Sequence, residues 1–190
     1  MRGYLSPANL VTSGNLVAGF ATLILATREE FVWAAGCVGV AAVLDVVDGM
    51  VARRSRAECE FGANLDSLAD LVTFGAAPAF TLYLSALEGV PVAGIGACLA
   101  FLLCGAWRLA RFPLAAKSRW YFVGLPIPLA GVIVMTLAAL APSTGVILGV
   151  TLALALLMVS VLPFPTWSEL ARLARADRRV EVEETPATPE

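Results

Sequence analysis

Long apolar runs separated by short polar stretches dominate the pattern of hydrophobic and polar positions along the chain. Each run is about as long as the roughly 20 apolar residues that cross a bilayer as a helix. The runs lie at residues 6–26, 31–53, 61–87, 92–112, 123–141 and 144–162. The pattern therefore predicts an all-α membrane protein with six transmembrane helices.

Proline positions indicate where these helices begin or change. Ser6 and Pro7 form an N-cap and first-turn pair for the first helix. Pro126 and Pro128 lie near the start of the fifth run. Pro78 lies inside the long third run, where we expect it to kink the helix, because proline lacks the N–H that an interior turn needs.

The C-terminal end departs from the apolar pattern. Thr166 and Glu169 form a capping box, which predicts a short cytoplasmic amphipathic helix at 166–180. Residues 181–190 are acidic and contain proline, so we expect a disordered tail. The expected organisation is a six-helix transmembrane domain at 1–165 followed by these two segments.

Composition supports the membrane assignment. The 190 residues are 59% hydrophobic and 15% charged, with a mean hydropathy of +0.82. Soluble domains are about 45–50% apolar and about 25% charged. With six spans, every basic residue except Arg28 falls on one side of the bilayer, and the positive-inside rule makes that side cytoplasmic. Both termini are therefore expected in the cytoplasm.

The residue inventory excludes several kinds of chemistry. The chain has no histidine, so catalytic triads, imidazole bases and histidine zinc sites are ruled out. Lys117 is the only lysine and no phosphate-binding P-loop surrounds it. The net charge of −2 says little, because the placement of the charges matters more, and no nucleic-acid partner is expected.

Four carboxylates lie inside the second and third runs: Asp45, Asp48, Asp66 and Asp70. Each costs about 2.5–3.5 kcal/mol at a bilayer centre, so a compensating partner is expected. Asp45 and Asp48 are spaced i, i+3, and Asp66 and Asp70 i, i+4, so each pair forms one acidic edge of its helix. A short basic connection allows the two helices to lie antiparallel with these edges facing.

Converging carboxylates repel one another unless cations enter, and oxygen ligands without His or Cys suit Mg²⁺ or Mn²⁺. Pairs of such ions recur in phosphoryl-transfer sites. The alternatives are helix caps or ion pairs for some of the aspartates, or a cation relay in a transporter. The neighbours favour a phosphate-bearing substrate, because Gly49, Ala52 and Gly62 clear space and Arg53 ends the second helix at the membrane surface.

Residues 45–70 resemble the signature of the CDP-alcohol phosphotransferase family, D-x2-D-G-x2-A-R-x8-G-x3-D-x3-D. All eight fixed positions match with unbroken spacing, at Asp45, Asp48, Gly49, Ala52, Arg53, Gly62, Asp66 and Asp70. The resemblance implies a dimeric six-helix membrane enzyme that cleaves a CDP-linked lipid. It implies that the four aspartates bind two metal ions and that Asp70 also acts as general base.

The resemblance also implies a nucleotide site. Gly49, Ala52, Arg53 and Gly62 would accommodate the CDP moiety. The first helix resembles the family's P-N-x-x-T-x-x-N opening with one residue inserted, so Asn9 and Thr12 are expected to contact the nucleotide as well. The alternative is that polar residues of the first helix, Thr12 and Asn15, only form hydrogen bonds between helices.

Three further stretches, at residues 61–78, 108–112 and 122–128, resemble the members of this family that use serine as acceptor. The expected reaction is attack of the L-serine hydroxyl on CDP-diacylglycerol, or on an archaeal ether analogue, with release of CMP. Arg108 and Arg111, at the cytoplasmic end of the fourth run, are expected to bind the serine carboxylate, and their alternative role is anchoring to headgroups.

Other acceptors, such as glycerol 3-phosphate or an inositol phosphate, stay open within the family. Outside it, an ion-coupled transporter would use the same carboxylates without releasing CMP. The expected location is the cell membrane, in contact with its lipids and with the active site facing the cytoplasm.

Overall fold

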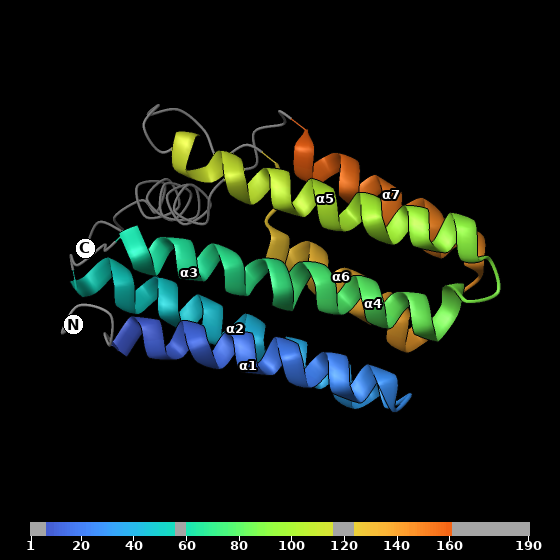
Figure 1. Ribbon diagram of the computed structural model, residues 1–190, viewed down its shortest axis with the longest axis horizontal. Coiled ribbons are helices and arrows are strands. Elements are labelled where there is room, and N and C mark those ends of the chain that lie inside the picture. Colours follow the sequence, from blue (N-terminus) through green and yellow to red (C-terminus); the bar gives the residue numbers. More distant parts are fainter. Residues whose placement is uncertain (1–6, 56–59, 116–123, 161–190) are drawn as a thin grey trace, which may run out of the picture.

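The computed structural model describes residues 7–55, 60–115 and 124–160, and every regular element in these ranges is helical. The elements are α1 (Pro7–Thr27), α2 (Phe31–Ser55), α3 (Glu60–Asp70), η1 (Leu71–Ala76), α4 (Ala77–Leu82), η2 (Tyr83–Leu87), α5 (Pro91–Ala115), α6 (Ile127–Leu140) and α7 (Thr144–Val159). Figure 1 shows them running side by side as one elongated bundle. Ser6 and the predicted segments 166–180 and 181–190 lie outside the described residues.

Helices α1 and α2 pair as a hairpin through a turn that suits its sequence. Glu29 adopts a left-handed conformation with φ 61°. The Glu29 N–H donates to the Ala26 carbonyl and the Glu30 N–H to the Leu25 carbonyl, both at 3.0 Å. These two bonds form a Schellman motif, which satisfies carbonyls at the end of α1. The turn directs α2 back along α1 and so sets the first side of the site.

The third predicted helix is one continuous rod built from α3, η1, α4 and η2. Pro78, where a kink is predicted, lies near the start of α4, and the helix continues through it with π-helical stretches before and after α4. In a regular α-helix the Pro78 ring would clash with the Phe74 carbonyl four residues earlier. The π-helical η1 that precedes α4 widens the turn at this place. Helix α6 packs closely here, since a Cβ on Gly131 would lie 2.5 Å from the Phe74 carbonyl oxygen.

The fifth predicted helix begins later than its apolar run. Pro126 is the N-cap of α6, which starts at Ile127. Before it, Gly124 has φ +90° and the Leu125 N–H donates to the Leu157 carbonyl at 3.3 Å. The chain therefore uses this stretch to cross to the end of α7, and the helix begins only after the crossing.

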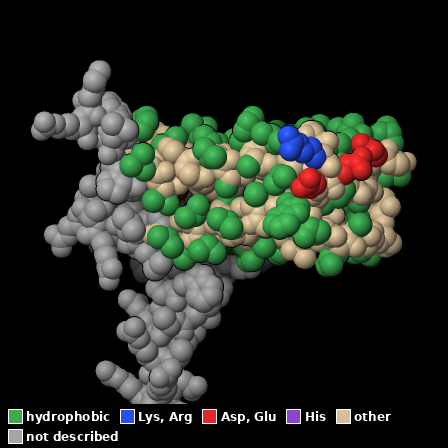
Figure 2. Space-filling model, turned by 90° about the horizontal axis from the view of Figure 1, so that it is seen from below, with side chains coloured by type: hydrophobic (Ala, Val, Ile, Leu, Met, Phe, Trp, Pro, Cys, Tyr) green, Lys and Arg blue, Asp and Glu red, His purple; other side chains and the backbone are tan. Residues whose placement is uncertain are grey.

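Three helical stretches are long and apolar enough to cross a membrane: Asn9–Thr27, Phe61–Leu87 and Pro91–Arg111. Three shorter helical stretches are also apolar, at Phe31–Val47, Ile127–Leu140 and Thr144–Val159. The bundle exposes large apolar side chains along its length, and on the face that Figure 2 shows the charged side chains gather toward one end. These features define a helical membrane protein.

Candidate active site

Three of the four predicted carboxylates converge in the structure. Asp45 comes from α2, and Asp66 and Asp70 come from α3. One carboxylate oxygen of each lies within 4.8 Å of the others. Asp70 is buried, with 8% of its surface exposed, and the other two are half-buried. Asp45 of α2 therefore faces the predicted acidic edge of α3, which Asp66 and Asp70 form.

The fourth predicted carboxylate, Asp48, lies on α2 after Asp45. Asp48, Gly49, Ala52 and Arg53 lie on the last turns of α2. Their side chains lie outside the part of the structure that is described, so their roles stay predictions.

Helix α1 closes the site from the side. Asn9 and Thr12 are both buried on α1, and α1 packs on the helix that carries Asp66 and Asp70. A Cβ on Gly62 would lie 2.9 Å from the Asn9 Oδ1 atom. The absence of a side chain at Gly62 thus allows α1 and α3 to pack closely. Its predicted role in leaving space for the CDP moiety stays a prediction.

Asn15 connects α1 directly to the cluster. Its Nδ2 donates to the Asp70 Oδ1 at 3.4 Å, and its backbone carbonyl accepts from the Thr73 Oγ1 at 3.0 Å. The predicted hydrogen bonding between helices is therefore confirmed for Asn15. Sequence reasoning missed that its partner is a carboxylate of the cluster, although the second Asn of the P-N-x-x-T-x-x-N stretch was the signal.

The two predicted serine-binding arginines have different surroundings. Arg108, on α5, is half-buried and close enough to Asp70 for their charges to interact. Its Nε is buried without a hydrogen-bond partner among the described residues. Arg111 is exposed, and its Nη1 donates to the Val159 carbonyl at 3.4 Å. Both arginines nevertheless line one cavity of about 260 Å³ together with Trp107, Ala110 and Val159.

The donor set fits a hard divalent cation. The three clustered ligands of the described residues are all carboxylates, and oxygen donors are the preferred ligands of Mg²⁺ and Mn²⁺. Without a cation, three carboxylates this close would repel one another strongly. The cluster therefore forms a candidate metal site.

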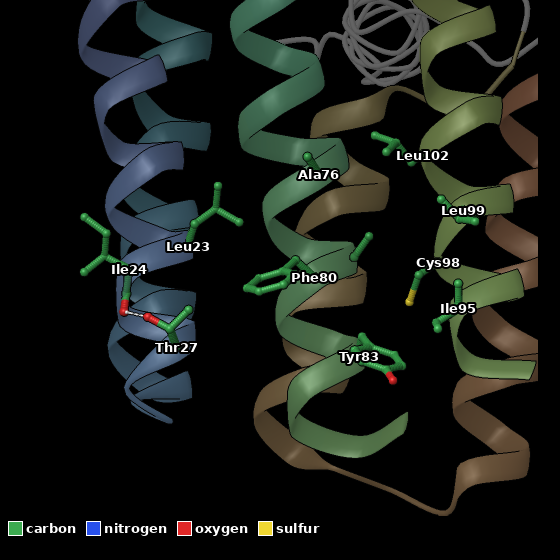
Figure 3. A pocket seen from close by; sticks show the side chains of 11 residues that line it. Leu23, Ile24, Thr27, Ala76, Phe80, Tyr83, Ile95, Cys98, Leu99 and Leu102 are labelled. Atoms are coloured by element: carbon green, nitrogen blue, oxygen red, sulfur yellow. Dashed lines mark hydrogen bonds between the residues drawn. The ribbon is translucent and has the colours of Figure 1, made fainter. Parts of the chain in front are cut away.

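A second hollow in the described bundle lies away from this chemistry. A groove of about 610 Å³ runs between α1, α4, η2 and α5, and its wall is almost entirely apolar. Figure 3 shows side chains such as Leu23, Phe80, Ile95 and Leu99 around it. The hydroxyl of Thr27 at its far end donates to the Ile24 carbonyl of its own helix at 2.8 Å. Its lining residues include no charged side chain.

The fold and the site together define a membrane protein with an intramembrane carboxylate cluster suited to cations. Comparison with known proteins assigns the family. The family model for CDP-alcohol phosphatidyltransferase matches residues 5–165, and the chain belongs to that family.

Similar proteins agree on one name. The chain is 35% identical to the CDP-diacylglycerol–serine O-phosphatidyltransferase of Bacillus subtilis over 162 residues, which is 85% of this chain and 91% of that protein. It is 33% identical to the protein of the same name from Helicobacter pylori, over 88% of this chain and 74% of that one. With the Methanocaldococcus jannaschii protein of that name it shares 30% identity, over 88% and 77%.

Proposed function

We propose that this protein transfers a phosphatidyl group from CDP-diacylglycerol to L-serine, which gives phosphatidylserine and CMP. The observation that carries the proposal is the convergence of Asp45, Asp66 and Asp70 within a family-matched helical bundle. The names of the similar proteins from bacteria and an archaeon support serine as the acceptor.

In the proposed reaction, the serine hydroxyl oxygen attacks the phosphorus that carries the diacylglycerol. The bond from this phosphorus to the oxygen bridging the two phosphates breaks, and CMP leaves with the electron pair. Asp70 accepts the hydroxyl proton. Two Mg²⁺ or Mn²⁺ ions held by Asp45, Asp48, Asp66 and Asp70 would neutralise the diphosphate and stabilise the departing oxygen.

Other residues bind the two substrates. Asn9, Thr12 and Gly62, with Gly49, Ala52 and Arg53 of α2, accommodate the CDP moiety in this proposal. Arg108 and Arg111 hold the serine carboxylate, and their shared cavity supports this assignment. Arg108 is the better supported candidate for this contact, because its charge interacts with that of Asp70 and its buried Nε has no hydrogen-bond partner among the described residues.

The membrane arrangement extends the same proposal. All six predicted helices cross the bilayer, and both termini lie in the cytoplasm. The protein acts in the cell membrane as a homodimer, with its active site facing the cytoplasm. The six apolar helical stretches, and the placement of every basic residue except Arg28 on one side of them, support this orientation.

The test is an assay with purified protein in detergent and CDP-diacylglycerol. A panel of L-serine, glycerol 3-phosphate and inositol phosphate is offered as acceptor, with Mn²⁺ or Mg²⁺, and CMP release is measured. Serine alone should give product, and a chelator should abolish turnover until the ion is restored. Product from glycerol 3-phosphate would refute the acceptor, and the absence of CMP with every acceptor would favour a transporter.

A further inference from the structure

Asn15 occupies an unusual position for a polar residue in an apolar helix. It is 2% exposed and lies where α1 packs on the helix that carries Asp70. Its Nδ2 donates to Asp70 Oδ1. Its Oδ1 is also buried and finds no partner among the described residues. A residue placed only to join two helices would lie more favourably with both ends of its amide satisfied.

Thr73 shows that the contact is fixed from both sides. Buried threonines in helices usually donate to a carbonyl one turn earlier in the same helix. Thr22 and Thr81 do so, to Ala18 and Ala77. Thr73 instead donates across the interface to the Asn15 carbonyl at 3.0 Å. The hydroxyl therefore holds the backbone of the residue that holds Asp70.

Gly19, one turn after Asn15, allows this close approach. A Cβ at Gly19 would lie 2.8 Å from the Thr73 Cα, whereas one at Gly14 would meet nothing within 4 Å. The α-to-π change falls at the same place, because Asp70 is the last residue of α3 and η1 begins at Leu71. Such π-helical turns occur frequently at functional sites.

We infer that Asn15 is a positioning residue for Asp70. The hydrogen bond fixes one oxygen of the carboxylate and so sets the direction of the other, while Thr73 and Gly19 hold Asn15 in place. The inference rests on the proposed function in taking Asp70 as a metal ligand. Groups that orient a metal ligand usually change metal affinity or activity about 10–100-fold when they are lost.

The test measures Mn²⁺ binding directly, by the EPR signal of free Mn²⁺ over purified full-length protein in detergent. Asn15→Leu keeps the side-chain size and removes the donor, and it should weaken Mn²⁺ binding about 10–100-fold. Thr73→Val should weaken it in the same direction by a smaller factor. Thr81→Val is the matched control, since Thr81 is equally buried on the same rod and bonds only within it.

A structural role alone predicts a different result. If Asn15→Leu and Thr73→Val lower the melting temperature but leave the Mn²⁺ dissociation constant within about twofold of wild type, the inference is wrong. Failure of the proposed function is separate, because it appears in the wild type. If the wild-type protein releases no CMP but binds Mn²⁺, and Asn15→Leu binds Mn²⁺ more weakly, the proposed function is wrong and the positioning role stands. If the wild-type protein binds no Mn²⁺, both are wrong.

Discussion

The two halves of the bundle differ in the hydrogen bonds that their buried polar side chains form. At the carboxylate end, Asn15 and Thr73 form hydrogen bonds from one helix to another. In the half that contains the apolar groove, the buried Thr22 and Thr81 donate only to carbonyls of their own helices. An unsatisfied polar group is costly in hydrocarbon, and a bond within its own helix already satisfies a threonine hydroxyl. A hydrogen bond from one helix to another is therefore expected where the site needs the two helices held together. The difference indicates that the carboxylate end is built around ligands and the other half around packing.

The largest expected effect comes from Asp70→Asn. The substitution keeps the shape of the side chain but removes the proton acceptor and a metal ligand, so kcat for CMP release should fall by about 10²–10⁴-fold. The melting temperature should change little, because a buried carboxylate is replaced by a neutral amide. A variant that keeps more than about a tenth of wild-type kcat would remove Asp70 from the mechanism.

At the carboxylate end, the sequence predicted which helices and aspartates come together, but not the contacts around them. The spacing of Asp45, Asp66 and Asp70 on two antiparallel helices was enough to place the three together, because helical periodicity determines which residues share a face. The third helix was predicted at 61–87, and the rod ends at Leu87.

Features that depend on packing between helices were not predictable. Pro78 indicates a disturbance of the third helix, but hydropathy periodicity does not predict that this disturbance takes the form of π-helical turns or that α6 packs closely on Phe74. The partner of Asn15 and the separate surroundings of Arg108 and Arg111 likewise depend on rotations of helices about their axes. The late start of α6 reflects Pro126 acting as a cap, although hydropathy alone extends the run further back.

The second prediction separates the two arginines. Arg108→Ala should raise the KM for serine about tenfold or more, since a hydrogen bond between charged groups, here to the serine carboxylate, contributes about 1.5–3 kcal/mol. Its KM for CDP-diacylglycerol should change less. Arg111→Ala should have a smaller effect, because Arg111 is exposed and bonds the Val159 carbonyl. Equal effects on both substrates in Arg108→Ala would contradict serine binding.

The third prediction concerns packing beside the site. Gly131→Ala places a methyl group against the Phe74 backbone, and overpacking of this kind costs about 1–3 kcal/mol. The melting temperature in detergent should therefore fall. Gly149→Ala is the control, because a Cβ there meets nothing within 4 Å. If both variants melt like wild type, the close approach of α6 and η1 is absent in solution.

The smallest effect is expected in the apolar half. Leu99 is 51% exposed and lines the groove, so Leu99→Phe adds an apolar ring where lipid or side chains can yield. The KM for serine and the Mn²⁺ concentration for half-maximal CMP release should stay within about twofold of wild type, because no polar group of the cluster contacts this wall. A change in either quantity as large as that of Arg108→Ala would show that the two halves are coupled. The division between a ligand-binding end and a packing end would then have to be abandoned.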